Sequence, residues 1–410
     1  MAEQKAKIPS ILEGKHLFKG DKPLLLIFFS LIVCSILVFY SASPKLGVGI
    51  QAITQTHSRL ASHIFSIILG VIAAFITYII PLKKINKLSR LAFYLSLFLT
   101  CITPFVGESI NGATRWLRIF GFSFQPSEFL KISTIVFTAY LISANRDYVP
   151  KWSFLVVLRM CYNRNTQIRE KDIDILKHGL AEMVLVCVAV VVVLLEHTSS
   201  AFLLGFSIFS VWFIGGIRNK ELLKILAIGV ILILAMVFLY NIGRSGTAKN
   251  RFKDWIELLT EDFDVNKKVN DFKDAEFSMA AIYNGGLYGN GAGQSIMRAK
   301  MTHPESDYIF GIFFEEYGLI LAIPLILAYL WIFARCLIIA ERSRWVYAQL
   351  SVFGLGLMMT TQAMIHFMVA VNFAPETGQT LPLISHGGSS IICYSIAMGY
   401  ILNASKQQEI

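Results

Sequence analysis

Charged residues are scarce in this sequence. Asp, Glu, Lys and Arg make up 16% of its 410 residues, whereas hydrophobic residues make up 55% and the mean hydropathy is +0.60. A soluble domain carries about 25% charged residues, so the composition excludes that class of protein. Apolar runs of about 20 residues recur instead, which is the length of a helix that crosses a bilayer. The sequence therefore predicts an all-α polytopic membrane protein, and such continuous runs give no indication of strands.

Paired or clustered cysteines are also missing. The six cysteines are scattered, mostly within apolar runs, and show neither a disulfide framework nor metal-ligand spacing. The formal net charge of +10 does not indicate nucleic-acid binding, because the excess of Lys and Arg lies in loops between apolar runs, where membrane topology places it. No small-residue cleavage signal follows the first apolar run, so we interpret that run as a span rather than a signal peptide.

About ten transmembrane helices are predicted, and we expect them to form a single integral membrane domain over residues 1–410. The connection between spans seven and eight, residues 242–307, is far longer than an ordinary loop. Within it, 251–259 has the spacing of an amphipathic helix on the membrane surface, and 276–284 indicates a short helix. The predicted spans lie near residues 24–43, 60–81, 90–106, 127–145, 178–196, 200–217, 222–241, 308–334, 347–371 and 387–404.

The basic residues of the connections indicate the orientation. Four connections rich in Lys and Arg, 82–90, 146–177, 218–224 and 335–346, fall on the side of the basic N-terminus. The positive-inside rule places this side, and with it both termini, in the cytoplasm. Residues that act on a substrate are therefore expected on the other, extracytoplasmic face, which carries the long 242–307 loop.

The first polar motif on that face contains two arginines ahead of an acid–base pair. Ser127 is placed to cap the fourth span, and Glu128 and Lys131 share one face of the same helix. A lysine at a membrane helix entrance requires a partner or water, so the pair is either a structural bridge or part of a site. Arg115 and Arg118 carry planar donors that bind phosphate, and contact with lipid headgroups is the alternative interpretation.

The turn between spans five and six carries Glu196 beside His197. An acid and an imidazole suggest a catalytic pair. Adjacent residues in a turn need not face each other, however, and no nucleophile pattern surrounds them. A simple polar hairpin is an equal interpretation.

The long loop ends in a glycine-rich segment, and an acid then precedes the eighth span. Gly285 and Gly286 are expected to end the short helix, and the glycines to let the backbone approach a substrate. A nucleotide-binding loop is excluded, because no strand precedes them and no Gly-Lys-Ser/Thr follows.

Asp307 lies at the boundary of the eighth span. Burial there should raise the pKa of its carboxyl, and a nearby Lys or Arg should lower it. Such tuning suits a general base, and a helix N-cap is the alternative interpretation. Glu315 and Glu316 lie deeper, where at least one requires a partner.

The last polar motif, residues 372–390, interrupts the boundary between spans nine and ten with two prolines and three glycines. Irregular backbone at this depth is tolerated only where it lines a cavity or packs against protein. The first turn of span ten offers free N–H groups, which suit an anionic group. The predicted substrate contacts of this motif are Pro375, Thr377, Gly378, Ser385, Gly388 and Ser389.

Taken in order, these motifs resemble those of the SEDS family (shape, elongation, division and sporulation proteins) over nearly the whole chain. NGATRW with FQPSEFLK is similar to the family's GARRW and FQPSE-x-x-K block. NGGLYGNGAGQS with ESDYIF and EEYG is similar to its GGL-x-G-x-G-x-G, T-D-F-I-F and EE-x-G block, and PETGQTLPLISHGGSS resembles its P-x-T-G-x-x-L-P-F-x-S-x-GGSS signature. The N-terminal segment is more similar to the division branch than to the elongation branch, and His386 replaces a common Tyr.

The resemblance implies a ten-span bacterial glycosyltransferase of the plasma membrane, which polymerises lipid II into a nascent glycan strand on the outer face for septal cell-wall synthesis. The implied partners are a transpeptidase of the class B penicillin-binding type, other divisome or elongasome proteins, and membrane lipids. The family's essential aspartate maps onto Asp307, which we expect to act as general base, and its Glu and Lys map onto Glu128 and Lys131.

A diphosphate leaving group requires positive charge. The candidate residues are Arg115, Arg118, Lys131, Arg244 and Arg298, and Ser127, Gly285 and Gly286 complete the expected substrate contacts. No cofactor is certain; no metal-ligand cluster is recognised, and a divalent cation, Mg²⁺ or Mn²⁺, is left open. Two other function classes are also left open. A lipid II flippase requires buried charges along a path through the membrane, and a non-catalytic scaffold would only recruit the transpeptidase.

Overall fold

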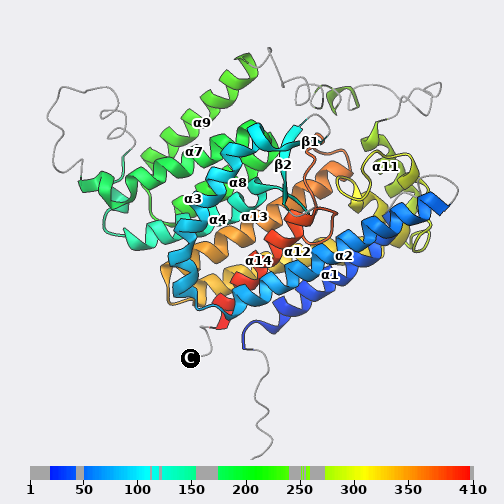
Figure 1. Ribbon diagram of the computed structural model, residues 1–410, viewed down its shortest axis with the longest axis horizontal. Helices are drawn as coiled ribbons and strands as arrows, with labels where there is room; N and C mark the ends of the chain where they lie inside the picture. Colours follow the sequence, from blue (N-terminus) through cyan, green and yellow to red (C-terminus); the bar gives the residue numbers. More distant parts are fainter. Residues whose placement is uncertain are drawn as a thin grey trace, which may run out of the picture.

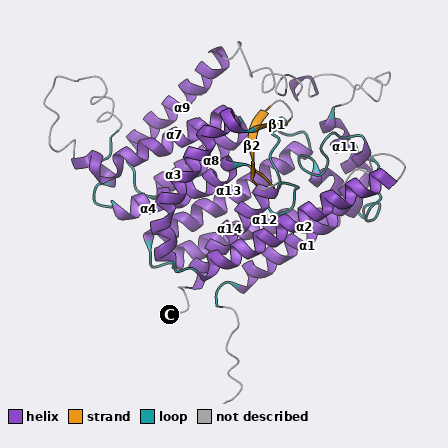
Figure 2. Cartoon of the chain, in the orientation of Figure 1, coloured by secondary structure: helices purple, strands orange, loops and turns teal. Residues whose placement is uncertain are grey.

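Each predicted span corresponds to one helix of the structure, a computed structural model (Figures 1 and 2). It describes residues 19–42, 50–110, 113–119, 122–153, 174–239, 251, 253, 255–258 and 273–406. The ten helices that match the predicted spans are α1 (Lys22–Ala42), α2 (Ile50–Ile79), α3 (Leu82–Val106), α4 (Pro126–Ala144), α7 (Ala181–Glu196), α8 (Thr198–Ile214), α9 (Asn219–Leu239), α12 (Ile309–Arg342), α13 (Val346–Ala370) and α14 (Gly388–Ser405).

Length and apolarity support a membrane location. Seven helices among the described residues are long and apolar enough to cross a bilayer: α1, α2, α3, α4, α7, α12 and α13. The remaining described elements are short: α11 (Asp274–Gly285), a π-turn (Leu176–Leu180) and two 3₁₀ turns (Val149–Lys151 and Met297–Ala299). The prediction of an all-α polytopic membrane fold is confirmed.

The helices form an inner and an outer group. In the most apolar 18-residue stretch of each helix, 78% of the residues of α4 and 67% of those of α13 are buried, whereas the figure for α2 and α3 is only 28%. Helix α14 is buried along nearly its whole length and runs beside α2 (Figure 1). The exposed apolar side chains of the outer helices, such as Phe75 and Phe98, are suited to contact lipid tails.

The expectation of no strands is wrong for the segment between α3 and α4. Strands β1 (Glu108–Ile110), β2 (Ala113–Ile119) and β3 (Phe122–Phe124) form a small antiparallel sheet in the order β1-β2-β3. Ile110 pairs with Ala113 across the first connection, which carries Asn-Gly, a dipeptide typical of hairpin turns. Two of the three strands have only three residues, which is too short to show the alternation that predicts a sheet.

Two helix starts differ from the capping predictions. Helix α4 begins at Pro126 with Gln125 at the N-cap, so Ser127 lies inside the first turn and the cap assigned to it is wrong. Helix α12 begins at Ile309 with Tyr308 at the N-cap, so Asp307 precedes the cap position. The carboxylate of Asp307 is therefore free of the capping role that was its alternative interpretation.

The two described ends of the chain meet at one end of the bundle. Asp21 forms an ion pair with Arg335 near the end of α12, and its backbone N–H donates to Ser405 Oγ at 2.9 Å. Tyr78, at the end of α2, donates to the carbonyl of Lys19 at 2.7 Å. Both ends on one side agree with an even number of spans, and the opposite side, called the Asp307 end below, carries the polar motifs.

Candidate functional site

The loop between α13 and α14, residues 371–387, is the centre of the Asp307 end. Its backbone is irregular, and Leu383 is buried with a φ of 67°. A branched residue in this left-handed region costs free energy and persists only where the surrounding structure holds it. Tyr329 OH donates to the carbonyl of Pro382, which fastens this part of the loop to α12. The irregular backbone predicted here therefore packs against protein, as its depth requires.

Asp307 lies directly against this loop. A Cβ added at Gly378 would lie 3.8 Å from Asp307 Oδ2 and 3.5 Å from an Arg251 guanidinium nitrogen. Ser385 Oγ donates to the carbonyl of Ser306 at 2.8 Å, and the His386 N–H donates to the carbonyl of Glu305 at 2.9 Å. The structure thus brings Gly378 and Ser385 of the last motif together with the predicted general base.

The environment of Asp307 raises the pKa of its carboxyl above the usual range. Burial is the main cause, and the negative charge of Asp274 adds to it. The Ser306 hydroxyl and the positive charges of His303 and Arg251 act in the opposite direction. A carboxylate tuned in this way is a stronger base than an exposed one, which suits proton abstraction from a hydroxyl.

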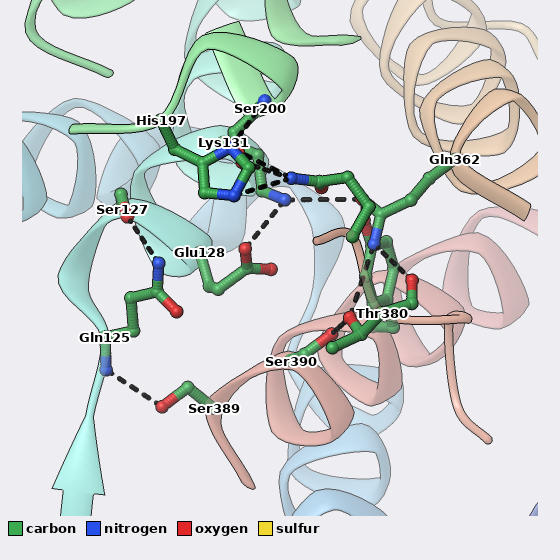
Figure 3. Close-up of polar contacts among 12 residues, drawn as sticks. Gln125, Ser127, Glu128, Lys131, His197, Ser200, Gln362, Thr380, Ser389 and Ser390 are labelled. Carbon is green, nitrogen blue, oxygen red and sulfur yellow. Dashed lines mark hydrogen bonds and ion pairs between the residues drawn. The ribbon is translucent and has the colours of Figure 1, made fainter. Parts of the chain in front are cut away.

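Glu128 and Lys131 form a buried ion pair on α4. Lys131 Nζ lies 2.8 Å from Glu128 Oε1 and donates to Gln362 Oε1 of α13 at 3.3 Å. Gln362 Nε2 donates to the carbonyl of Thr380 at 2.8 Å, so the pair is connected to the α13–α14 loop (Figure 3). The Lys131 side chain is 1% exposed, so its ammonium group does not extend to the water at the membrane surface.

His197 belongs to the same network, so the interpretation of the 196–200 turn as a simple hairpin is incomplete. Gln379 Nε2 lies 3.2 Å from His197 Nδ1 and donates to Ser200 Oγ at 2.9 Å. Burial, followed by the positive charges of Arg115, Lys131 and Arg251, lowers the pKa of His197 to about 3. His197 is therefore neutral and stands among three cations that come from distant parts of the sequence.

The small sheet separates the two predicted arginines. Side chains three residues apart on a strand point to opposite faces. Arg115 is half-buried and interacts with Glu196 and His197, whereas Arg118 is exposed and lies opposite Ser123. The start of α14 is fastened to the same sheet, because Ser389 Oγ accepts from the Gln125 N–H at 2.9 Å and donates to the carbonyl of Ser123 at 3.3 Å. Only Arg115 of the pair turns toward the site.

The glycine-rich segment packs against α12, where Gly318 interrupts the helix with a φ of 69°. A Cβ at Gly285 would lie 2.2 Å from the carbonyl oxygen of Phe314, and one at Gly289 equally close to that of Glu316. Backbone hydrogen bonds from Asn290, Gly291, Leu319 and Ile320 join the two segments. Close packing of backbone on backbone is thus a sufficient reason for these glycines, and Gly286 follows as the exposed C-cap of α11.

Glu315 and Glu316 hold this segment in place. Glu315 accepts hydrogen bonds from the Ser295 hydroxyl and from the N–H groups of Ile296 and Met297 at 3.2 and 3.3 Å. Glu316 accepts from the Ser41 hydroxyl and lies 4.0 Å from Arg298, which also donates to the carbonyl of Ser41. The contacts of Arg298 are therefore to α1 and α12, and both glutamates have the partners that their depth requires.

A second link to the α13–α14 loop comes from two histidines. His386 Nδ1 lies 3.3 Å from His63 Nδ1 of α2, and His63 Nε2 lies 2.9 Å from Ser35 Oγ of α1. Ser35 Oγ donates to the carbonyl of Ile384 at 2.8 Å, and Phe39 stacks on His63. His386, the residue that departs from the family pattern, thus joins the loop to α1 and α2.

Several important residues were not predicted. Arg251 lies 3.7 Å from Glu376, and Trp255 of the same short helical segment donates to the carbonyl of Asn372 at 3.1 Å. This segment thus packs on the α13–α14 loop, and its amphipathic spacing was the available signal. Gln362 and Gln379 had no sequence signal, because single glutamines in apolar helices or loops carry none.

Other predicted residues have less defined surroundings. Pro375 and Thr377 are partly exposed in the α13–α14 loop, and Gly388 is the first residue of α14. Arg244 lies outside the described residues. Over the described part of the chain, no group of three or more His, Cys, Asp and Glu side chains is arranged to hold a metal ion.

Comparison with known proteins gives a family for the whole chain. Residues 22–410 match the family model FTSW_RODA_SPOVE, described as cell cycle protein. The chain is similar to the probable peptidoglycan glycosyltransferase FtsW of Saccharophagus degradans, with 27% identity over 92% of this chain and 91% of the relative. The protein of the same name from Caulobacter vibrioides is 25% identical over 91% of this chain and 85% of the relative.

Solved structures share the fold. The rod shape determining protein RodA of Thermus thermophilus is 20% identical, with a TM-score of 0.62, over 95% of this chain and 98% of that one. A chain from a structure described as the coordination of polymerization and crosslinking by a peptidoglycan synthase complex is 20% identical, with a TM-score of 0.66, over 95% and 98%. Since the family model covers nearly the whole sequence, the protein belongs to the FtsW, RodA and SpoVE family of cell cycle proteins, the SEDS family that its motifs predicted, with FtsW the favoured branch.

Proposed function

We propose that this chain is a peptidoglycan glycosyltransferase, which joins lipid II units into glycan strands at the outer face of the bacterial plasma membrane. The observation that carries the proposal is the Asp307 carboxylate, whose pKa is raised and which lies against the α13–α14 loop beside Arg251. The names of the curated relatives support the same activity.

In the proposed reaction, Asp307 removes the proton from the 4-hydroxyl of one lipid II sugar. The hydroxyl oxygen then forms a bond to the anomeric carbon of the growing chain, with inversion, as the bond from that carbon to undecaprenyl diphosphate breaks. A positioned general base contributes about 10²–10⁴-fold to such a rate. Burial of Asp307 supports this role, because it raises the proton affinity of the carboxylate.

The diphosphate leaving group gains one further negative charge when its bond to the sugar breaks, and this charge must be stabilised. The positive charges of Arg115, Lys131 and Arg251 all lower the pKa of His197, so the three cations lie near one residue of the site. Arginine forks bind phosphate oxygens in pairs, and Glu128 and Gln362 hold the Lys131 ammonium in a fixed position. We assign the leaving-group role to these three residues. A divalent ion, Mg²⁺ or Mn²⁺, would add to the same charge stabilisation, and an assay with and without EDTA tests that requirement.

The proposed partner is a transpeptidase of the class B penicillin-binding type, within the division machinery. Structural likeness to a chain of a peptidoglycan synthase complex supports a partner of this kind. Depletion of the protein in cells tests the division role: filaments indicate septal synthesis, whereas round cells would assign the chain to elongation.

Purified protein with its partner and labelled lipid II provides the direct test. We expect wild-type protein to form glycan polymer, and Asp307→Ala to reduce the rate by at least 10²-fold with no change in thermal stability. Equal polymer formation by Asp307→Ala would refute the role of Asp307. Transport of lipid II across liposomes without polymer formation would favour a flippase, and neither activity would favour a scaffold.

A further inference from the structure

The Glu196 carboxylate, at the C-terminal end of α7, is buried, and neither of its oxygens has a hydrogen-bonding partner within 3.5 Å, although the Ser127 hydroxyl and Arg115 lie near it. The residue is 7% exposed, and neither Oε1 nor Oε2 makes a hydrogen bond. It is the one carboxylate in the described part of the chain with both oxygens buried and unsatisfied. Leaving such a group unsatisfied costs free energy, so its retention indicates a partner that binds during function.

Glu196 lies beside the site described above. Its polar neighbours are Ser127 and Arg115, and Ser127 already accepts a hydrogen bond from Gln125 Nε2 at 3.2 Å. The next residue, His197, is joined to Gln379, which follows the glycine that lies against Asp307. In Figure 3, Ser127, Glu128 and His197 lie on the same side of the network.

A second unsatisfied carboxylate oxygen belongs to Glu128, the residue next to Ser127. Glu128 Oε1 pairs with Lys131, but Glu128 Oε2 is buried and makes no hydrogen bond. Glu128 is adjacent to Ser127 in the first turn of α4, and Figure 3 shows its carboxylate pointing toward Lys131. The carboxylate oxygens of Glu196 and Glu128 are acceptors, and a ligand that binds them must supply hydrogen-bond donors.

The charges of the site restrict the donor to a neutral group. Arg115, Lys131 and Arg251 all lie near enough to His197 to lower its pKa, and their positive charges disfavour an ammonium group or a metal ion at this position. The described residues also lack a cluster of three metal ligands. Sugar hydroxyls and the N–H of an acetamido group are neutral donors, and a carboxylate accepts from two of them at once.

We propose that Glu196 is a substrate-contacting residue that accepts hydrogen bonds from a hydroxyl or acetamido N–H of the saccharide bound at the Asp307 end. This inference rests on the proposed function and adds the part of the site that recognises the sugar. The cations bind the diphosphate, and Glu196 binds neutral donors of the saccharide. Substitution should therefore weaken saccharide binding more than it slows the chemical step.

Steady-state polymerisation by the full chain with its partner tests this separation. Glu196→Gln should lower kcat/KM for lipid II about 10–100-fold, mostly through a higher KM, because a hydrogen bond to a charged group is lost. Its thermal stability should be unchanged, because the removal of a buried charge offsets the loss of its attraction to Arg115. Glu182→Gln is the matched control on the same helix, because Glu182 is paired with Arg90 at 3.1 Å. An unchanged KM, or a loss of thermal stability that accompanies the loss of activity, overturns the proposal.

Direct binding distinguishes failure of this inference from failure of the proposed function. Lipid II binding is measured for Asp307→Asn and for the double variant Asp307→Asn/Glu196→Gln, neither of which should turn over. The double variant should bind lipid II at least tenfold more weakly, while both should bind undecaprenyl diphosphate, which lacks the saccharide, equally. Equal binding of lipid II overturns the role of Glu196 alone. Absence of lipid II binding in both variants overturns the proposed function, and this inference with it.

Discussion

Glu315 and Glu196 are both buried glutamates near the Asp307 end, but their surroundings are opposite. Glu315 is 0% exposed and accepts hydrogen bonds from a hydroxyl and two backbone N–H groups. Glu196 is 7% exposed and accepts none. A fully satisfied carboxylate stabilises the fold that satisfies it, whereas an unsatisfied one reduces stability and is retained for another reason. The glycine-rich segment around Glu315 is therefore a structural region, and the turn at Glu196 is the proposed binding region.

The largest expected effect is on the structural region. Glu315→Ala leaves the Ile296 and Met297 N–H groups without their acceptor and should lower the free energy of unfolding by about 2–5 kcal/mol. Thermal unfolding in detergent measures this loss, with Glu196→Gln as the comparison that should show none. An unchanged melting temperature for Glu315→Ala would remove the distinction between the two regions.

A Gly→Ala substitution, which adds one methyl group, can be compared in the glycine-rich segment and beside Asp307. Gly289 has a φ of 77°, and an added Cβ would lie 2.2 Å from the Glu316 carbonyl, so Gly289→Ala should lose about 2–3 kcal/mol of stability. Gly378 has a φ of 61°, but its Cβ would meet Arg251 and Asp307 Oδ2 at no less than 3.5 Å. Gly378→Ala should lose only about 1 kcal/mol and yet reduce polymerisation strongly. Thermal unfolding and the lipid II assay on both variants decide this, and equal losses of stability would contradict it.

The smallest expected effect is a shift in pH dependence. A general base acts in its ionised form, so polymerisation should rise with pH through the raised pKa of Asp307. Arg251→Gln removes a positive charge that lowers this pKa, and should move the rise to higher pH. Asp274→Asn removes a negative charge that raises it, and should move the rise to lower pH. Plots of kcat/KM against pH for the wild type, Arg251→Gln and Asp274→Asn give the order of the three midpoints. If both variants shift the midpoint in the same direction, Asp307 is not the group that titrates.

Most of the fold could be predicted because apolar runs of helix length are read directly from the sequence. Each predicted span became a helix, although α2 and α12 extend well beyond their apolar cores. The sheet was missed because two of its three strands have only three residues. The Asn-Gly dipeptide between the first two strands was the one local signal in the sequence, and the surrounding motif drew attention to its arginines instead.

The site could be predicted only in part. Motifs pointed to Asp307, Glu128 and Lys131, because their chemistry is unusual at a membrane boundary. Gln379 and His197 are 182 positions apart, and no local pattern indicates that they meet. That both oxygens of Glu196 lack a hydrogen bond can be recognised only from the folded structure, because it depends on the positions of all the neighbouring donors. Sequence patterns thus identify reactive residue types, whereas the hydrogen bonds that a residue lacks are a property of the folded chain.

In the histidine contact at the α13–α14 loop, the hydrogen bonds determine which ring nitrogens of His63 and His386 carry a hydrogen. The single hydroxyl hydrogen of Ser35 is donated to Ile384, so Ser35 can only accept from the Nε2–H of His63. A neutral His63 then has a bare Nδ1, and the Nδ1 of His386 must supply the hydrogen between the two rings. One further proton on His63 would place two N–H groups face to face. The loop that holds Asp307 is therefore tied to α1 and α2 by a bond that exists in a single tautomeric arrangement of two rings.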